Sequence, residues 1–247
     1  MTERIRADVL LYRRGLAPSR ERAQALIREG RVSAGGALVT KPGAFFDEGV
    51  LFVVAAREGS DFASRAGYKL DPALDVFALS LEGKVVVDVG ASTGGFTDAA
   101  LRRGARKVYA VDVGHDQLAP RLRDDARVVV RDRTNARNLT AANFDEPVDV
   151  VLVDASFISL TKLAEALARV LPNGGLLVAL VKPQFEVGPE LARRARGVIR
   201  NHAQRLAAIQ VVRDDLEKEG FSIIAAVDSS VPGPKGNIER FLYAKRV

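Results

Sequence analysis

The chain of 247 residues contains no cysteine, and His115 and His202 are its only histidines. Without cysteine, disulfide bonds and thiolate metal sites are excluded. Two histidines offer few nitrogen ligands for a zinc ion. We therefore expect a protein that holds no metal, with a sizeable core built from the 47% of its residues that are hydrophobic.

Long apolar runs are also missing from the sequence. No run approaches the roughly 18 residues that a membrane-spanning helix needs. At the N-terminus, charged residues interrupt the apolar ones every few positions, which is unlike a signal peptide. We expect a cytoplasmic protein without a membrane partner.

Acidic residues are in the minority. The chain has 37 lysines and arginines against 31 aspartates and glutamates, which gives a net charge of +6. Residues 1–59 hold ten of the basic and seven of the acidic residues, and so carry half of the excess positive charge. A basic chain favours a polyanionic partner such as a nucleic acid.

The first 59 residues combine two helical patterns with β-type stretches, and we call them the N-terminal module. Ser19 is a favourable helix N-cap, and Gly30 suits the left-handed position after a helix. Spaced arginines on these helices would form a cationic face for a phosphate backbone. They are Arg13, Arg14, Arg20, Arg22, Arg28 and Arg31. Charge alone leaves a second interpretation open, a solvated helix face with salt bridges.

The stretch SRERAQALIREGRVSAGGALVTKPG, residues 19–43, resembles the S4 RNA-binding domain. The resemblance depends on the ordered pattern Ser19-Arg20, Leu26-Ile27, Gly30 and Lys41-Pro42. It implies a structured RNA as partner but names no reaction. We expect RNA contacts from basic residues of this module and of two later segments. They are Arg4, Arg6, Arg20, Arg22, Arg28, Lys41, Arg65, Arg193 and Arg194.

From residue 84 onward, apolar strand-like runs alternate with helical stretches. Near-continuous apolar runs such as KVVVDVG and GLLVALVK suit strands covered on both faces. Seven such runs predict a doubly wound α/β sheet. Only a short Pro/Gly loop joins the last two strands, so they should be antiparallel. This order is typical of class I S-adenosylmethionine-dependent methyltransferases. Helices are expected at 97–103, 117–123, 160–170 and 202–219.

Three segments follow from these patterns. We expect the N-terminal module at 1–59, a linker with a first helix carrying Lys69 at 60–83, and a methyltransferase-like domain at 84–247. The linker contains the stretch SRAGYKL, residues 64–70. Taken alone, this stretch indicates a solvated linker, so a chemical role for Lys69 depends on residues elsewhere in the chain.

A glycine-rich loop, DVGASTGGFT, follows the first strand at residues 88–97. Glycines let the backbone turn tightly and a ligand approach closely. The G-x-G-x-x-G of nicotinamide enzymes is absent, because Ser92 replaces its second glycine. Asp88 suits a cationic amino group, and Asp112 at the end of the second strand suits a ribose diol. Either acid alone would fit a helix cap or a solvated strand end, but together they predict a nucleoside cofactor.

The third strand is followed by Asp132 and Asn135, which could contact an adenine edge. The expected cofactor-binding residues are therefore Asp88, Gly90, Ala91, Ser92, Thr93, Gly94, Gly95, Phe96, Asp112, Asp132 and Asn135.

Three ionisable residues stand at the ends of later strands. Asp154 ends the fourth strand, Lys182 ends the fifth, and Glu239 begins the last. The carboxyl ends of strands face the ligand crevice in this fold, and burying a lysine unpaired is costly. The pattern alone also fits a structural Lys182–Asp154 salt bridge and an exposed charge at Glu239.

The segments SRAGYKL, DVGASTGGFT, VDAS, LVKPQFEVG and GNIERFLY occur in an order and spacing that resemble the TlyA family of rRNA 2′-O-methyltransferases. This family is related to the FtsJ-like methyltransferases, and the resemblance covers essentially the whole chain. It implies a catalytic tetrad of Lys69, Asp154, Lys182 and Glu239, and S-adenosylmethionine as the cofactor. It also implies methylation of a cytidine ribose in ribosomal RNA. The large subunit is the expected target, because the chain looks like the shorter type of the family, and the small subunit is a second one.

Within this resemblance we interpret Lys182 as the base that orients and deprotonates the 2′-hydroxyl. A lysine acts as a base when burial or a neighbouring cation lowers its pKa. Lys69 would supply that cation and contact RNA, while Asp154 and Glu239 would hold the two lysines.

The segment PQFEVGPELARRARGVIRN, residues 183–201, departs from the family, which usually has glycines and a lysine in its middle. Its arginines fit either an RNA contact or a flexible charged loop. Three other functions remain open at this stage. They are a membrane-active haemolysin, which would need an amphipathic or spanning apolar segment, a non-catalytic ribosome-associated RNA-binding protein, and a small-molecule O-methyltransferase.

Overall fold

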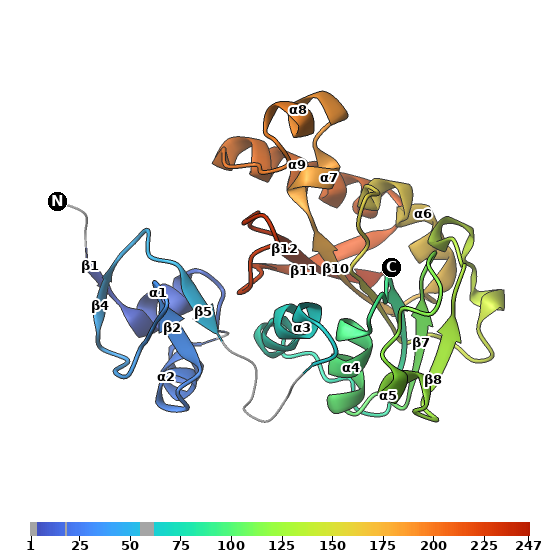
Figure 1. The fold of residues 1–247 in the computed structure, drawn as a ribbon, viewed down its shortest axis with the longest axis horizontal. Helices are drawn as coiled ribbons and strands as arrows, with labels where there is room; N and C mark the ends of the chain where they lie inside the picture. The colour runs from blue at the N-terminus through green and yellow to red at the C-terminus, as the bar shows by residue number, and fades with distance from the viewer. Residues whose placement is uncertain (1–3, 18, 55–61) are drawn as a thin grey trace.

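The computed structural model describes residues 4–17, 19–54 and 62–247. The N-terminal module lies at one side of the larger domain, as Figure 1 shows. The expected segment boundary between residues 59 and 60 lies outside the described residues.

The N-terminal module consists of two helices between short strands. In chain order its elements are β1 (Arg4–Arg6), α1 (Ala7–Arg13), α2 (Arg20–Arg28), β2 (Val32–Ala34), β3 (Ala37–Leu38), β4 (Phe45–Asp47) and β5 (Phe52–Val54). β1 pairs with β4, and β2 lies between β3 and β5, all antiparallel. The Ser19 hydroxyl accepts a hydrogen bond from the Arg22 backbone N–H at 3.1 Å, so the expected N-cap is confirmed. The apolar residues of both helices and of β2 and β5 form one separate core.

The larger domain contains the expected seven-stranded sheet. Its strands are β6 (Val85–Val89), β7 (Lys107–Val111), β8 (Val128–Arg131), β9 (Val150–Val153), β10 (Leu176–Val181), β11 (Phe221–Asp228) and β12 (Arg240–Arg246). Their order is β11-β12-β10-β9-β6-β7-β8. The pairs from β8 across to β10 are parallel, whereas β12 is antiparallel to both β10 and β11. The strand inserted in reverse is therefore confirmed.

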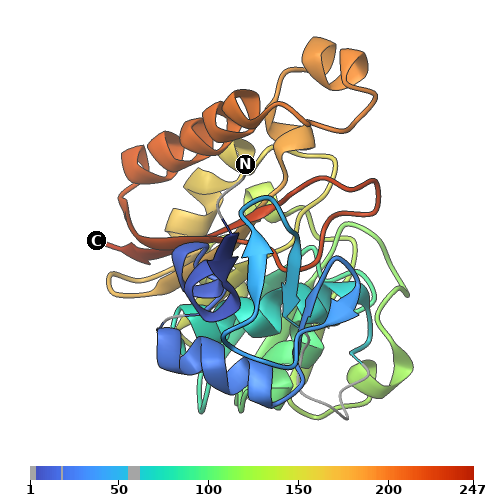
Figure 2. The ribbon, with the colours of Figure 1, turned by 90° about the vertical axis from the view of Figure 1, so that its left-hand side faces the viewer.

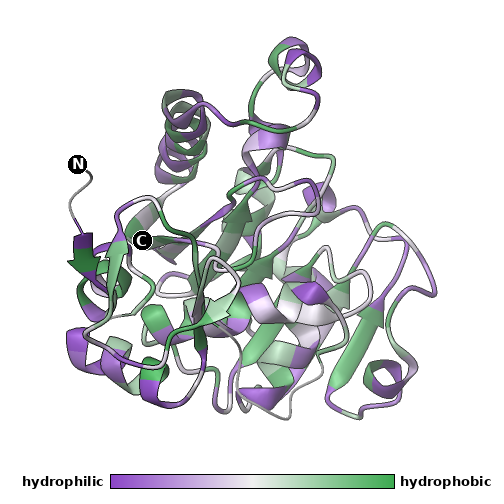
Figure 3. Cartoon of the chain, turned by 60° about the vertical axis from the view of Figure 1, so that its left-hand side comes forward, coloured by the Kyte–Doolittle hydropathy of each residue, from purple (hydrophilic) through white to green (hydrophobic). Residues whose placement is uncertain are grey.

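Helices cover both faces of this sheet (Figure 2). They are α3 (Arg65–Val76), α4 (Gly95–Arg102), α5 (Pro120–Arg123), α6 (Ala164–Val170), α7 (Pro183–Glu186), α8 (Pro189–Arg194) and α9 (His202–Lys218), with 3₁₀ turns at Ala136–Asn138, Ala141–Asn143 and Leu160–Lys162. One core cluster joins α3 and α4 to the sheet, and a second joins α6 and α9 to its other face. Figure 3 shows the hydrophobic strands between helices of mixed hydropathy.

Two expected helices are shorter than the sequence pattern predicts. The helix expected at 117–123 begins only at Pro120, because the proline ring fixes φ for a first helical position and cannot continue a helix from earlier residues. The helix expected at 160–170 is divided into a 3₁₀ turn and α6. The segment expected as a loop after Lys182 forms the short helices α7 and α8.

Helix α3 belongs structurally to the larger domain. Its N-cap Ser64 accepts a hydrogen bond from the Ala66 backbone N–H, and its apolar face packs on α4 and the sheet. Gly67 and Gly95 allow a close approach at this contact, since a Cβ at Gly95 would collide with Ser64 and Ala66. This packing fixes the orientation of the helix that carries Lys69.

Candidate active site

Three neighbouring strands bring Asp154, Lys182 and Glu239 to one edge of the sheet. Asp154 directly follows β9, Lys182 directly follows β10, and Glu239 directly precedes β12. The last registered pair between β10 and β12 is Val181 with Arg240, so Lys182 and Glu239 are the next residues on the two strands. The strand register therefore gathers the three side chains at the same place.

The four expected catalytic residues form two ion pairs. Lys182 Nζ lies 2.7 Å from Asp154 Oδ1, and Lys69 Nζ lies 2.7 Å from Glu239 Oε2. Lys69, Lys182 and Glu239 are 7%, 6% and 1% exposed, so these charges are largely removed from water. The structural Lys182–Asp154 salt bridge allowed by the sequence is present, and it sits where a catalytic pair would sit.

Lys182 has two further acceptors. Its Nζ lies 2.7 Å from the Ser156 hydroxyl and 3.3 Å from the Asp154 carbonyl oxygen. A lysine ammonium group has three donor positions. Two of them donate to the Ser156 hydroxyl and the Asp154 carbonyl oxygen, and the Asp154 carboxylate lies beside the group as an ion-pair partner. The sequence interpretation assigned Ser156 no role, although it is the last residue of the quoted segment VDAS.

A cavity of about 470 Å³ opens at the carboxyl ends of β6, β7 and β9. Five expected residues line it: Gly90, Ser92, Asp112, Asn135 and Asp154. The lining also includes Val89, Val111, Val113, Gly114, Gln117, Thr134, Ala136, Ala155, Ser156, Phe157, Ile158 and Leu163. This volume suits a small organic ligand, and the lining is apolar with a few polar groups, as is usual for such sites.

Asp112 organises the rim of this cavity. Its Oδ2 accepts from the Ser92 backbone N–H at 2.9 Å, and its Oδ1 accepts from the Gly114 backbone N–H at 2.8 Å. A carboxylate has about four acceptor positions, so Asp112 retains lone pairs for a ligand hydroxyl. Asp112 thus holds two loops together and is exposed to the cavity at the same time.

Gly90 is the point of closest approach between two strand ends. Its φ is +83°, and a Cβ there would lie 2.9 Å from the Asp154 carbonyl oxygen. A side chain would therefore push β6 away from the loop that carries Asp154. Glycine at this position keeps the cavity floor and the ion pair in register.

Asp88 lies outside the cavity lining, in contrast to the expected contact with a cationic group. Side chains alternate along a strand, and because Val89 lines the cavity, Asp88 points to the opposite face. It is fully buried, and its Oδ2 accepts from the Thr97 hydroxyl at 2.7 Å. Its Oδ1 has no hydrogen-bond partner among the described residues. Burial raises the pKa of Asp88 to about 7, and the nearby charges of Asp154 and Asp112 add to that rise.

The other expected cofactor residues also lie off the cavity lining. Phe96 is 1% exposed, with its ring 6.0 Å from that of Phe241, and belongs to the core under α4. Asp132 accepts a hydrogen bond from the Asp116 backbone N–H at 3.0 Å and so shapes the loop after β7. The remaining residues of this set, which belong to the turn into α4, are Ala91, Thr93, Gly94 and Gly95.

Phe157 is an exposed aromatic residue at the cavity rim that the sequence interpretation missed. It is 91% exposed, and its φ of +65° is unusual for a bulky residue. Its ring lies 5.2 Å from that of Phe185, which belongs to α7 just after Lys182. A hydrophobic ring held in a strained position beside reactive groups is a common feature of functional sites.

The segment after Lys182 is tethered rather than a free loop. Asn237 is 3% exposed, and its side chain accepts from the Ile199 backbone N–H at 2.9 Å and donates to the Gly197 carbonyl at 2.7 Å. These bonds fix residues 197–199 to the turn before Glu239. Arg193 and Arg194, expected to contact RNA, are exposed on α8, and Arg194 lies 4.0 Å from Glu190.

Most of the expected RNA-binding residues of the N-terminal module are held in place by neighbours. The buried carboxylate of Asp8 pairs with Arg6 at 2.9 Å and with Arg20 at 3.2 Å. Hydrogen bonds from Arg6 are the main cause that lowers the Asp8 pKa well below its usual range. Within the module, Arg4 donates to the Phe45 carbonyl, Arg22 to Glu29 and Arg28 to Gln24, whereas Lys41 is exposed. Arg65, on α3 of the larger domain, donates to the Pro232 carbonyl.

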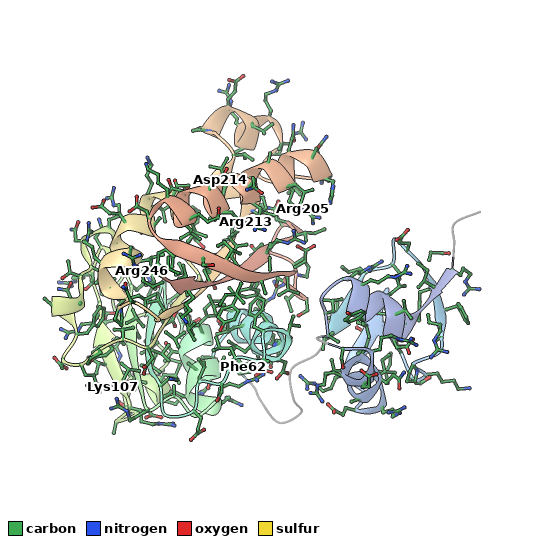
Figure 4. The ribbon with its side chains drawn as sticks, turned by 180° about the vertical axis from the view of Figure 1, so that it is seen from behind. Phe62, Lys107, Arg205, Arg213, Asp214 and Arg246 are labelled. Carbon is green, nitrogen blue, oxygen red and sulfur yellow. The ribbon has the colours of Figure 1, made fainter. Side chains whose placement is uncertain are left out.

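A second cavity, of about 960 Å³, lies between the N-terminal module and the larger domain. Its basic residues are Arg13, Arg14, Arg205 and Arg240, and its acidic ones are Glu48 and Asp228. Figure 4 shows Arg205 on α9, near the end of that helix closest to the N-terminal module. The cavity is therefore a cationic recess between the two parts of the chain.

No cluster of three histidine, cysteine, aspartate or glutamate residues suited to a metal ion occurs within the described ranges. Among those same residues, no helix is long and apolar enough to cross a membrane.

Comparisons with protein families divide the chain in two. A family model for FtsJ-like methyltransferases matches residues 62–246, and a model for the S4 domain matches residues 5–51.

Individual relatives match along almost the whole chain. The 16S/23S rRNA (cytidine-2′-O)-methyltransferase TlyA of Mycobacterium tuberculosis is 41% identical over 245 residues, which cover 99% of this chain and 91% of that protein. Hemolysin A of Brachyspira hyodysenteriae is 39% identical over 237 residues, covering 95% of this chain and 97% of that protein.

A solved structure of a hemolysin from Streptococcus thermophilus superposes with a TM-score of 0.73. It is 39% identical in sequence, and the match covers all of this chain and 90% of that one.

Proposed function

Because this chain belongs to the FtsJ-like methyltransferase family and carries an S4 domain in front of it, we propose that it methylates a ribose 2′-hydroxyl of ribosomal RNA. The substrate is a cytidine, in the large ribosomal subunit first and in the small subunit as a second target. The observation that carries this proposal is the ion pair between the buried Lys182 and Asp154, because Asp154 also lines the 470 Å³ cavity.

The residues around that cavity fit S-adenosylmethionine. Asp112 keeps acceptor positions for a ribose diol, and the apolar wall of Val111, Val113 and Leu163 suits an adenine ring. Gly90 gives the backbone the close approach that a bound cofactor needs. When bound, S-adenosylmethionine supplies an electrophilic methyl group and leaves as a neutral thioether. Of the residues expected to hold it, Gly90, Ser92, Asp112 and Asn135 are the ones we retain for direct contact.

Lys182 has the position of the group that handles the hydroxyl proton. A ribose hydroxyl is a weak acid, so its attack requires alignment and removal of a proton. A 2′-hydroxyl can replace one of the three acceptors around Lys182 Nζ. The Ser156 hydroxyl is the exchangeable one, because it is neutral and its residue is exposed, whereas the Asp154 carboxylate is charged and close. Lys182 would first release a proton to solvent, and Asp154 would orient the resulting neutral amine. The amine would then accept a hydrogen bond from the hydroxyl and take its proton, becoming an ammonium paired with Asp154.

Lys69 and Glu239 form the second pair at this edge. The strand register places Glu239 beside Lys182, and Lys69 neutralises Glu239 at 2.7 Å. In this mechanism the Lys69–Glu239 pair fixes the charge next to Lys182. Lys69 thereby offsets the negative charge of Glu239 beside Lys182.

The RNA reaches the site over an aromatic and cationic surface. Phe157 offers an exposed ring to a base, and stacking on an aromatic side chain is worth about 1–3 kcal/mol per base. Arg193 and Arg194 on α8, Arg65 at the start of α3, and the arginines of the interdomain cavity surround this approach. The S4 domain would bind the more distant part of the RNA, and the protein would work in the cytoplasm, where ribosomes are assembled.

The first test is methyl transfer by Lys182→Ala to purified ribosomal subunits that lack the modification. General-base groups contribute roughly 10²- to 10⁴-fold, so we expect turnover to fall by that factor while cofactor affinity, measured by calorimetry, stays within about threefold. Lys218→Ala, an exposed lysine at the end of α9, serves as the matched control. Near-normal turnover in Lys182→Ala would disprove the role of this lysine. Mass mapping of 2′-O-methylation in the reacted rRNA identifies the nucleotide and the subunit.

A further inference from the structure

Helix α3 stands between the active site and the N-terminal module. Successive residues of an α-helix are about 100° apart around its axis, so Asp71 and Asp75 lie roughly 200° and 240° away from Lys69. One face of α3 therefore presents Lys69 to Glu239. The opposite face presents two acids.

Those two acids bind arginines from both parts of the chain. Arg31 of the N-terminal module has its Nη2 atom 4.0 Å from Asp71 Oδ2 and 3.9 Å from Asp75 Oδ2. Arg103, at the end of α4, lies 2.6 Å from Asp71 and 2.7 Å from Asp75. The Arg31 side chain is only 5% exposed, which separates it from the exposed arginines of the same module. Its Nη2 atom faces the two acids of α3, and its Nη1 atom donates to Glu29 of its own module at 3.5 Å.

Apolar contacts accompany this ionic cluster. Leu16 and Val54 of the N-terminal module enclose a small void together with Pro72 and Ala73 of α3, and Lys69 borders the same void. Gly15 approaches β11 closely, because a Cβ at Gly15 would lie 4.0 Å from the Cβ of Val227. The N-terminal module therefore forms part of the wall around Lys69.

We infer that Arg31 is a positioning residue for methyl transfer, which docks the N-terminal module on α3 and thereby holds Lys69 against Glu239. This inference rests on the function proposed above. It assigns the N-terminal module a second task besides binding RNA: the module completes the active site.

The first measurement separates kcat from KM in Arg31→Gln. A displacement of about 1 Å at reacting groups can cost on the order of 10²-fold in rate, so we expect kcat to fall roughly 10- to 100-fold. KM for rRNA should change little, because Arg31 is not exposed to the RNA. Arg106→Gln is the matched control, since Arg106 is an exposed arginine in an ion pair with Glu146, away from the site. A higher KM with unchanged kcat would make Arg31 an RNA contact and overturn the inference.

The absence of cysteine from the chain allows a sharper second measurement. A Gly15→Cys/Val227→Cys pair has a Cβ–Cβ distance of 4.0 Å, within the range of a disulfide bond. The pair should cross-link on oxidation, and Arg31→Gln should slow this cross-linking. In the triple variant, which combines the two cysteines with Arg31→Gln, kcat should be low while the cysteines are reduced. Oxidation of the triple variant should raise its kcat to that of the oxidised double-cysteine variant.

Two results would overturn the inference. If the cross-link forms but does not restore kcat in the Arg31→Gln background, Arg31 acts by something other than docking. If the pair never cross-links, the docked arrangement itself is wrong. A parent chain that methylates no rRNA would overturn the proposed function and this inference with it, whereas an active parent without rescue overturns the inference alone.

Discussion

Among single residues, the buried charges of the larger domain differ in how they are compensated. Lys69, Lys182, Asp154 and Glu239 form close ion pairs, and Asp98 binds Arg102 and Arg121. Asp88 has no cation beside it among the described residues, and burial raises its pKa to about 7 although hydrogen bonds from Thr97 oppose the rise. A buried carboxyl group without a cation is favoured in its protonated form. Asp88 therefore links the stability of the domain to pH.

The direction of this link follows from the two pKa values. An unfolded aspartate has a pKa near 4, so between about pH 4 and pH 7 the folded state keeps a proton that the unfolded state releases. The free energy of unfolding must therefore decrease as the pH rises through this window, by up to a few kcal/mol. Asp88→Asn removes this contribution, because the amide stays neutral and still accepts from Thr97.

We predict that, in urea unfolding, the free energy of unfolding of Asp88→Asn rises relative to that of the parent chain as the pH increases. Between pH 5 and pH 8 the difference should grow in favour of the variant by about 2–3 kcal/mol. Parallel stability profiles for the two proteins from pH 5 to pH 8 would show that Asp88 does not titrate in this range.

At the scale of elements, a single side chain joins two segments of the active-site rim. Asn237 makes two hydrogen bonds to residues 197–199 and precedes Glu239 by two positions. The helices α7 and α8 thus depend on the β11–β12 turn for their position. The segment that follows α8 and the strand end that carries Glu239 are joined by the same amide group.

Asn237→Ala should loosen this rim without unfolding the sheet. The change leaves a buried backbone N–H at Ile199 and a carbonyl at Gly197 unpaired, which costs about 1–3 kcal/mol each at most. We expect faster tryptic cleavage after Arg193, Arg194 and Arg196, and a lower free energy of unfolding. Asn138→Ala, at an exposed position of a 3₁₀ turn, is the control. Equal cleavage rates in both variants would contradict the tether.

Sequence patterns predict the elements of this fold better than its contacts. The apolar runs were sufficient for seven strands, since the central strands β6, β9 and β10 are buried on both faces and leave a continuous signal. Lys69, Asp154, Lys182 and Glu239 were identified through family resemblance, and the structure brings them together in pairs. Ser156 and Phe157 were missed because residues just after a strand show no periodicity. Arg31 was grouped with RNA-facing arginines, since a helix-end arginine in a sequence does not reveal an acid 40 residues away.

For the whole molecule, the distribution of charge matters more than its sum of +6. The N-terminal module fixes Arg6 and Arg20 on the buried Asp8, and so presents two guanidinium groups in defined positions. The interdomain cavity adds Arg13, Arg14, Arg205 and Arg240. Basic residues therefore occur on the module and on both sides of the interdomain cavity.

Affinity for an rRNA fragment should consequently depend strongly on salt. Each neutralised phosphate releases counterions, and about six contacts reduce affinity roughly 10³-fold between 50 and 200 mM salt. Binding of the cofactor, measured under the same conditions, should change far less, because the 470 Å³ cavity is mainly apolar. An RNA affinity that stays constant over this range would argue against a phosphate-dominated interface.

The reversed strand β12 determines when the active site can form during synthesis. It lies between β10 and β11 in the sheet, yet it is the last strand of the chain. Glu239 follows Lys69 by 170 residues in the chain. During synthesis, Lys69 can therefore form its ion pair only after these residues have been added. A nascent chain whose S4 domain and first six sheet strands have left the ribosome still lacks β12, the strand that joins β10 to β11. The Lys69–Glu239 pair can thus form only after β6 to β11 have been made, since Glu239 follows all of them in the chain.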